Sequence, residues 1–197
     1  MWLLLWPALS LAVVASGYLG LGAKVFGKTS AGTIRVINFI VLFPYLITLW
    51  TLWHFARLFR RETPYHTLTE NIIIGRRLMA HELPDEIEHV VDLTCEFIEP
   101  KPMRQLSYVS MPILDGASIN PELLRESAEA VSRLSGKVYI HCAEGRGRTG
   151  LFAVAVLLAL NPEWSVQEAL EDALFKRPYL KLNRVQSDFL NQLDSLD

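Results

Sequence analysis

Cys142 and Arg148, with five residues between them, are the side chains whose spacing is best suited to chemistry. They belong to the run His-Cys-Ala-Glu-Gly-Arg-Gly-Arg-Thr-Gly, residues 141–150, whose glycines permit backbone conformations that a Cβ would block. Successive N–H groups of such a loop can point into one concavity and bind an anion. We predict a strand directly before the loop and a helix directly after it, so the helix N-terminus adds partial positive charge. The segment therefore predicts a phosphate-binding site.

The same arrangement favours nucleophilic chemistry at Cys142. A helix N-terminus and a neighbouring arginine stabilise the thiolate, which is the reactive form of a cysteine. A thiolate beside a bound phosphate can attack phosphorus and form a thiophosphoryl intermediate, while the planar fork of Arg148 contacts two phosphoryl oxygens. Thr149 can donate its hydroxyl to the sulfur and ease departure of the thiolate. Because backbone amides and Arg148 supply the charge stabilisation, we expect neither a metal nor another cofactor.

A purely structural loop is the alternative interpretation, since a strand, glycine loop and helix can bind phosphate without reacting, and many buried cysteines are inert. However, the pattern His-Cys-x-x-Gly-x-x-Arg-Thr-Gly fixes six residues at set spacing between a predicted strand and a predicted helix. This combination favours catalysis.

The loop resembles that of the protein-tyrosine phosphatase superfamily, and the small size of the domain resembles its dual-specificity branch. The resemblance covers residues 64–197, and outside the loop it rests on segments similar to an opening strand, a strand ending near a glutamate, and two closing segments: residues 71–75, 89–96, 177–178 and 183–190. It implies an α/β fold with a central mixed sheet flanked by helices, and cysteine-dependent hydrolysis of phosphomonoesters. It also implies that His141 hydrogen-bonds backbone near the loop and helps to set the thiolate.

A general acid must protonate the leaving group of such a reaction. Asp115, in a loop 27 residues before Cys142, matches the position of the family's aspartate acid. Asp92 is the alternative, but it falls within a predicted buried strand, where a structural role is favoured. Gln186 could orient a water molecule or could only pack.

The other positions of the predicted phosphate-binding loop are Ala143, Glu144, Gly145, Arg146 and Gly147. The side chains at 144 and 146 are expected to face the mouth of the site. A glutamate there is an unfavourable neighbour for a highly charged lipid headgroup, and the arginine compensates in part. We therefore expect a phosphorylated protein as substrate, with phosphotyrosine and also phosphoserine or phosphothreonine as targets. The alternative is a phospholipid, either phosphatidylglycerophosphate or a phosphoinositide.

The charge of the chain is divided unevenly. Residues 1–63 carry six basic residues and one acid, and the remainder carries 13 basic and 20 acidic residues, giving net charges of +5 and −7. An acidic catalytic part makes nucleic acid an unfavourable partner. The two cysteines, Cys95 and Cys142, indicate reduced thiols, although the family resemblance leaves a protective disulfide between them as an alternative.

Two apolar segments, at about residues 2–21 and 34–53, are each long enough to cross a hydrocarbon core of about 30 Å as a helix. We therefore predict that residues 1–63 form a multi-pass membrane anchor with two transmembrane helices, and that residues 64–197 form the catalytic domain. A cleaved signal peptide followed by one helix, and a buried hydrophobic subdomain, are the alternatives. Because a reactive thiolate is easily oxidised, we expect the catalytic domain and both termini in the cytoplasm.

Periodicity predicts the elements of the catalytic domain. Strands are expected at residues 71–75, 89–94, 108–113 and 137–141. Helices are expected at 84–88, from Asn120 to about 134, at 151–160, from Ser165 onward, and at 183–193, with Asn120 and Ser165 as N-caps.

Overall fold

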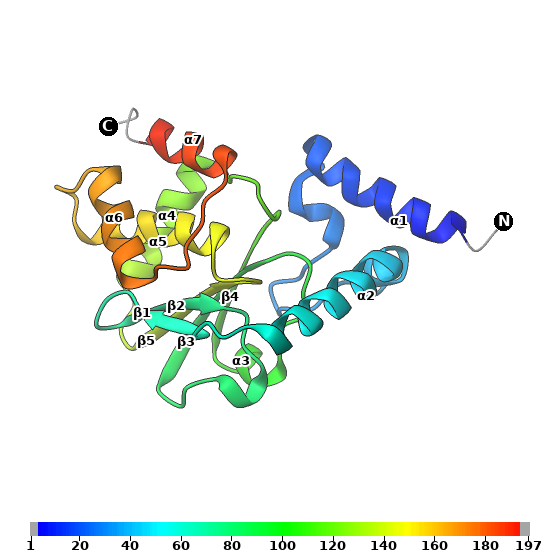
Figure 1. Ribbon diagram of the computed structural model, residues 1–197, viewed down its shortest axis with the longest axis horizontal. Coiled ribbons are helices and arrows are strands. Elements are labelled where there is room, and N and C mark those ends of the chain that lie inside the picture. Colours follow the sequence, from blue (N-terminus) through cyan, green and yellow to red (C-terminus); the bar gives the residue numbers. More distant parts are fainter. Residues whose placement is uncertain (1–3, 194–197) are drawn as a thin grey trace.

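The computed structural model describes residues 4–193, and a five-stranded mixed sheet lies at its centre (Figure 1). The sheet order is β1-β2-β5-β3-β4; β1 is antiparallel to β2, and all other neighbours are parallel. The strands are β1 (Tyr65–Thr67), β2 (Ile72–Arg76), β3 (Ile87–Thr94), β4 (Ser107–Ile113) and β5 (Lys137–Cys142).

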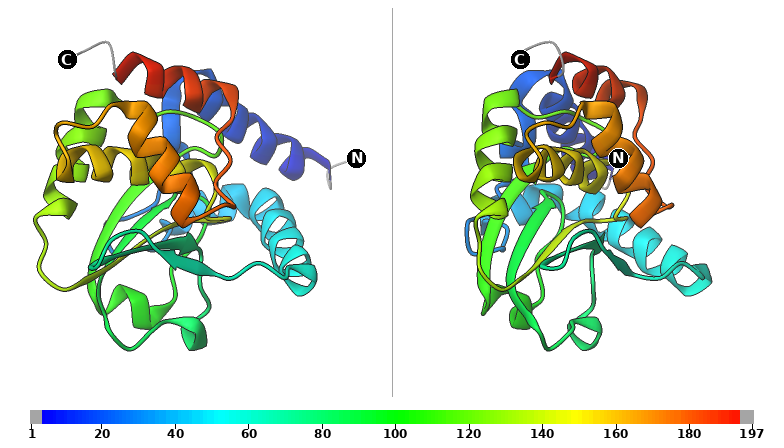
Figure 2. Two further views of the ribbon diagram at one scale, coloured as in Figure 1. Left: turned by 60° about the vertical axis from the view of Figure 1, so that its left-hand side comes forward. Right: turned by 90° about the vertical axis from the view of Figure 1, so that its left-hand side faces the viewer.

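Four helices cover one face of this sheet (Figures 1 and 2). They are α4 (Pro121–Ser132), α5 (Gly147–Leu160), α6 (Val166–Lys176) and α7 (Arg184–Leu193). Helix α5 lies innermost, because its residues 148–157 are all buried. Alternate strand residues such as Ile72, Ile74 and Ile140 join this core, while Ile73 and Tyr139 point to the other face. That second face is covered by α3 (Lys101–Arg104) and a 3₁₀ turn, Ala80–Glu82.

The predicted fold class and most predicted elements are confirmed. Both N-caps are present: the side chain of Asn120 accepts from the N–H of Leu123, and Ser165 forms a capping box with Glu168. The helix predicted at 84–88 is wrong. A turn in which Ile87 N–H donates to Pro84 C=O leads there into β3, because Ile87 pairs with Lys137 of β5. Strand β1 and helix α3 were not predicted.

The N-terminal region forms two long apolar helical segments. Helix α1 (Leu5–Ser16) continues through a π-helical turn (Gly17–Leu21) and a 3₁₀ turn (Gly22–Phe26), and α2 spans Val36–Phe59. The first predicted segment begins at residue 2, and its residues 2–3 lie outside the described part. The second helix extends six residues beyond its predicted end at 53.

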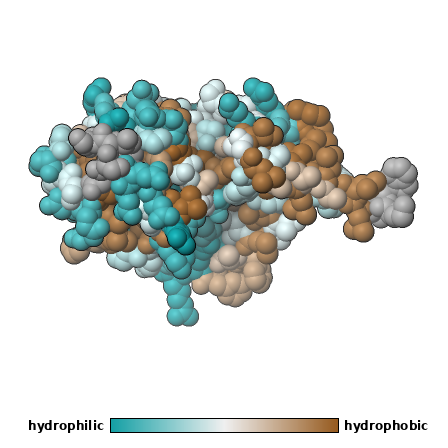
Figure 3. Space-filling model, turned by 90° about the horizontal axis from the view of Figure 1, so that it is seen from above, coloured by the Kyte–Doolittle hydropathy of each residue, from teal (hydrophilic) through white to brown (hydrophobic). Residues whose placement is uncertain are grey.

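Leu5–Phe26 and Val36–Phe59 are long and apolar enough to cross a membrane by length and composition alone. Only 22% and 17% of their most apolar windows are buried, so they differ from the core helix of a soluble protein. Figure 3 shows hydrophobic side chains gathered toward the side of the molecule that carries α1, and hydrophilic ones on the opposite side.

The N-terminal region also packs against residues after position 63. Val14, Phe26 and Leu46 share a buried cluster with Cys95 and Leu114. A boundary at residue 63 stays a prediction, because apolar side chains from both sides of it form one core.

Candidate active site

The loop at 142–148 connects the end of β5 to the start of α5, as predicted. Cys142 is the last residue of β5, where it pairs with Arg76 of β2, and it is 2% exposed. Gly145 has φ +65°, and a Cβ there would collide with the backbone of Gly75 and Arg76. Only glycine satisfies both constraints. The loop therefore passes tightly over β2 and brings its N–H groups to the N-terminus of α5.

Arg148 is buried and is held in place by its terminal nitrogens. Nη1 and Nη2 donate to the two carboxylate oxygens of Glu96 at 3.0 and 2.7 Å, and Nη1 also donates to Ile113 C=O at 3.0 Å. Burial on its own would raise the pKa of Glu96, but Arg148 outweighs burial and lowers it, so Glu96 is a carboxylate. The Nε of Arg148 is buried without a hydrogen-bond partner in the described part of the chain. A phosphoryl oxygen seated in the loop would accept from this Nε.

His141 and Thr149 both contact the backbone of Cys142. The Nδ1 of His141 is 3.4 Å from Cys142 C=O, which agrees with the backbone hydrogen bond implied by the family resemblance. The hydroxyl of Thr149 accepts from Cys142 N–H at 3.0 Å and donates to Gly75 C=O at 3.3 Å. The predicted hydrogen bond from Thr149 to the sulfur is absent among the described residues. Thr149 instead fixes the backbone that carries the sulfur.

Asp115 lies at the mouth of the loop. Its Oδ1 is 3.2 Å from Arg148 Nη2, its side chain is 76% exposed, and its C=O accepts from the hydroxyl of Tyr18. The rival, Asp92, is fully buried and bound to Lys28, Thr94 and Tyr108. Of these two aspartates, Asp115 is therefore the one that the structure brings to the loop at 142–148.

Asp115→Asn is expected to lower kcat by about 10²-fold for an alkyl phosphate, because general acid catalysis contributes roughly 10²–10⁴-fold when the leaving group is basic. A nitrophenyl phosphate needs little protonation and should lose much less. The measurement is kcat against leaving-group pKa for both proteins. A uniform loss across all leaving groups would contradict the assignment.

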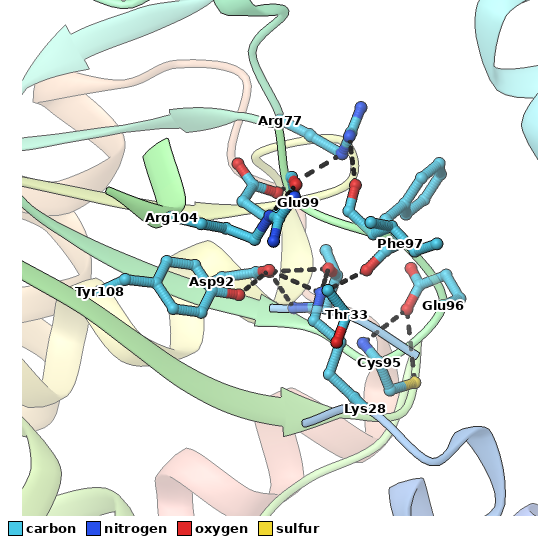
Figure 4. Close-up of polar contacts among 12 residues, drawn as sticks. Lys28, Thr33, Arg77, Asp92, Cys95, Glu96, Phe97, Glu99, Arg104 and Tyr108 are labelled. Carbon is cyan, nitrogen blue, oxygen red and sulfur yellow. Dashed lines mark hydrogen bonds and ion pairs between the residues drawn. The ribbon is translucent and has the colours of Figure 1, made fainter. Parts of the chain in front are cut away.

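A buried charge network lies behind the loop (Figure 4). Lys28 Nζ is 2.7 Å from Asp92 Oδ2, His141 Nε2 is 3.4 Å from Glu99 Oε1, and Arg77 Nε is 3.5 Å from Glu99 Oε2. The oxygens and nitrogen of Asp92, Glu99 and His141 lie close enough to hold a metal ion. However, Lys28 and Arg77 already bring positive charge to these carboxylates, so the cluster is better explained as an ion-pair network.

The network should make stability depend on pH. Burial would lower the pKa of His141, but Glu99 and Asp92 outweigh burial and raise it. A raised histidine pKa adds stability that is fully present below the unfolded value of about 6.5 and lost as pH rises through the folded value. We expect the free energy of unfolding in detergent to fall more between pH 6 and pH 9 for the parent chain than for His141→Gln. Subtracting the change measured for His141→Gln from that of the parent cancels the contribution of other titrating groups such as His66. Equal slopes would contradict an imidazolium at His141.

The outer positions of the loop are held by the N-terminal region. Glu144 pairs with Arg60, Arg146 pairs with Glu62, and the C=O of Ala143 accepts from Trp53 Nε1 at 3.0 Å. The expectation that the side chains at 144 and 146 simply face the mouth is therefore incomplete. Since Arg60 offsets the charge of Glu144, this glutamate is a weaker argument against a polyanionic substrate than it seemed.

Two residues of the closing segments, Arg177 and Gln186, contact the loop. The sequence assigned no role to Arg177. Arg177 is fully buried; its Nε donates to Gly145 C=O at 2.8 Å, and its Nη1 lies 2.8 Å from His66 Nδ1. Gln186 is packed beside Gly147, where its carbonyl oxygen accepts from Asn183 N–H. Arg177 positions the loop backbone, and the only sequence signal for it was the resemblance of residues 177–178 to a closing segment of the family.

Cys95 and Cys142 are both free. The thiol of Cys95 donates to Glu96 at 3.3 Å, and burial together with Glu96 raises its pKa well above the ordinary value. Cys95 is therefore a protonated thiol, which makes it a poor nucleophile.

A pocket of about 270 Å³ opens beside the loop. One wall belongs to the catalytic part and includes Glu96, Asp115 and Arg148. The other wall comes from the N-terminal region and is mostly apolar: Tyr18, Phe26, Tyr45, Leu49, Leu52, Trp53 and Ala56. The pocket thus joins the loop at 142–148 to an apolar wall.

Comparisons with known proteins agree with this geometry, although no family model matches the chain. Protein 197R of Invertebrate iridescent virus 6, which carries the name of a tyrosine phosphatase, is 35% identical over 95 residues, or 44% of this chain. The chain spans 34% of the length of that relative.

Solved structures cover more of the chain. Tk-PTP in its active form is 26% identical with a TM-score of 0.60, covering 67% of this chain and 97% of that one. PTPMT1 in complex with PI(5)P is 16% identical with a TM-score of 0.59, covering 68% and 96%. Further structural neighbours include dual-specificity phosphatases of mouse and human. The relatives and neighbours are tyrosine and dual-specificity phosphatases, so the resemblance predicted from the loop is confirmed.

Proposed function

We propose that this chain, which has the fold and the loop of the dual-specificity branch of the protein-tyrosine phosphatases, is a cysteine-dependent phosphomonoester hydrolase. The observation that carries the proposal is the juxtaposition of Cys142 with Arg148, whose buried Nε has no partner among residues 4–193. A dianionic phosphoryl group in the loop would accept from this Nε and from the backbone N–H groups of residues 143–148.

The reaction proceeds in two displacements. The Cys142 sulfur attacks phosphorus, the P–S bond forms, and the ester P–O bond breaks as Asp115 gives its proton to the leaving oxygen. Water then attacks phosphorus, Asp115 takes a proton from that water, and the P–S bond breaks to release phosphate and the thiolate. Arg148 and the loop N–H groups stabilise the charge on the phosphoryl oxygens in both steps.

The test is hydrolysis of an aryl phosphate by the full chain in detergent micelles, with a chelator present. The full chain is required because the N-terminal region supplies one wall of the pocket. We expect turnover that a chelator leaves unchanged and that orthovanadate inhibits. Activity that appears only with added metal would contradict the mechanism.

A phosphorylated protein is the first substrate class we propose, with phosphotyrosine before phosphoserine and phosphothreonine. The phosphatase relatives and neighbours support it, and Tk-PTP is the structural neighbour with the higher identity of the two compared in detail. Nucleic acid is not proposed as a partner, given the acidic catalytic part.

A phospholipid is the second candidate, and the apolar wall of the pocket favours it. Tyr45, Leu49 and Leu52 offer acyl chains a surface that a phosphopeptide does not need. The two classes are separated by kcat/KM for a phosphotyrosine peptide and for phosphatidylglycerophosphate, both in the same mixed micelles. A higher value for the lipid would make it the substrate class.

We further propose a membrane location with the catalytic domain in the cytoplasm. The two apolar helices support the membrane, and the oxidation-prone nucleophile supports the reducing compartment.

A further inference from the structure

Helices α1 and α2 expose many large apolar side chains. An exposed apolar surface of this kind marks a site of contact with another protein or with a membrane. On α2 they recur along the whole helix, from its first turn to its last. They are Val36, Ile37, Ile40, Phe43, Ile47, Leu52, Phe55, Leu58 and Phe59, and α1 adds Leu5, Leu9 and Leu11. Figure 3 shows the α1 side of this surface.

The start of α2 is fixed to the catalytic part of the chain. Lys28, in the loop before it, pairs with Asp92 of β3, and both side chains are fully buried. Glu99 N–H also donates to the C=O of Gly32 at 2.9 Å. The loop that joins the two apolar helices therefore lies against the sheet (Figure 4).

The end of α2 is fixed to the same catalytic part. Arg57 pairs with Glu82 at 2.8 Å, Trp53 Nε1 donates to Ala143 C=O, and Arg60 pairs with Glu144. Between the two ends, Trp50 Nε1 donates to Glu96 C=O at 2.9 Å. The catalytic part of the chain thus contacts the loop before α2, the second half of α2 and the residue after it.

These contacts bear on how α2 can meet a bilayer. A helix of 24 residues is about 36 Å long, which exceeds a hydrocarbon core of about 30 Å. If α2 crossed the bilayer, its two ends would lie in opposite aqueous phases, and one folded domain could not contact both. Crossing would require separating the buried pair of Lys28 and Asp92, which leaves uncompensated charges.

Basic side chains stand at the ends of the apolar helices. Lys24, Arg35 and Arg61 are exposed, and none of them has a carboxylate partner in the described part of the chain. Basic residues beside an apolar face are attracted to anionic headgroups. The surface therefore combines an apolar face with positive ends.

We infer that α1 and α2 lie in the plane of an anionic membrane interface and dock the catalytic domain on it, instead of crossing the bilayer. The mouth of the pocket then opens beside the lipid, because Leu52 belongs both to the uncovered face and to the pocket wall. This last step rests on the proposed function; the docking itself does not.

The docking is tested by introducing one cysteine at a time at two positions and measuring from which side of the membrane each one reacts. Ser30→Cys lies in the loop between the helices and Thr63→Cys follows α2, and both positions are exposed. Each is made in the full chain with Cys95→Ala and Cys142→Ser, in membrane vesicles of one orientation. A membrane-impermeant maleimide is expected to label both positions from the same side. Labelling of one position in intact vesicles and of the other only after detergent would overturn the inference.

Binding to vesicles gives a second measurement. The double variant Phe55→Glu, Leu58→Glu places charge on the uncovered face of α2. The matched control is Phe175→Glu, which makes the same kind of change at an exposed side chain of α6. We expect the first variant to bind phosphatidylcholine–phosphatidylglycerol vesicles on the order of 10-fold more weakly, and the control to bind like the parent. Unchanged binding of the first variant would overturn the inference. Aryl phosphatase activity of both variants in detergent reports separately on folding and on the proposed function.

Discussion

Replacement of Cys142 by serine is expected to lower kcat for an aryl phosphate by on the order of 10⁴-fold or more, since loss of a nucleophile that acts with a preorganised site has effects of this size. A serine hydroxyl is a far weaker nucleophile at neutral pH, and the described residues place no base beside position 142 that would activate it. The imidazole of the preceding residue, His141, has a raised pKa and is held by Glu99 behind the loop. The measurement is steady-state turnover of nitrophenyl phosphate by the full chain in micelles.

The loss should not come from unfolding. Cys142→Ser keeps the backbone N–H that donates to Thr149, so the thermal midpoint is expected to stay close to that of the parent. Cys95→Ser is the matched control, because its hydroxyl can still donate to Glu96 and most of the activity should remain. Activity retained in Cys142→Ser, or lost in Cys95→Ser alone, would contradict a role for Cys142 as nucleophile.

The strand, loop and helix around Cys142 could be predicted because the signals for them are local. Cys142, Gly145 and Arg148 are fixed by spacing within seven residues, and short-range geometry decides what they can do. The buried strands and the N-caps at Asn120 and Ser165 follow from equally local signals, namely apolar runs and capping side chains. Asp115 needed the family resemblance as well, because a loop carboxylate has no periodic signature.

The failures arose where pairing across the chain decides the structure. Residues 84–88 look like a helix start because Pro84 precedes acidic residues, yet the pairing of Ile87 with β5 begins a strand there. Strand β1 has only three residues and exists through its pairing with β2. Neither contact can be read from a local window.

The contacts between the N-terminal region and the rest of the chain could not be predicted from the sequence either. Lys28 and Asp92 are 64 residues apart, and Arg60 and Glu144 are 84 apart, so no periodicity links them. One signal did exist, since the first 63 residues are basic and the rest is acidic. We interpreted this difference as two separate parts, whereas in the structure opposite charges bring the parts together. The apolar character of the two N-terminal segments indicated a membrane, but it did not indicate whether the helices cross the bilayer or lie on it.

Replacement of Arg148 by lysine is expected to reduce kcat/KM by about 10²–10³-fold although the positive charge is kept, as removal of one oriented donor at an oxyanion typically does. The Nη atoms of Arg148 contact Glu96, Ile113 and Asp115, and in the proposed mechanism Nε is left for the phosphoryl group. A lysine offers one nitrogen, which cannot hold the Glu96 carboxylate at two points and also meet the substrate. Inhibition by orthovanadate should weaken in parallel, since it uses the same donors.

Glu96→Gln separates positioning of the arginine from its contact with phosphate. It removes the charge that pairs with buried Arg148 and is expected to cost about 3–5 kcal/mol in the free energy of unfolding, as for other buried pairs that lose one partner. Arg148→Lys keeps an ion pair and should unfold less readily than Glu96→Gln, while losing more activity at a temperature where both are folded. Arg133→Lys, in an exposed pair with Glu129 at the C-terminal end of α4, is the control and should change neither quantity. If Arg148→Lys retained parent activity, the clamp would have to be assigned to the loop amides alone.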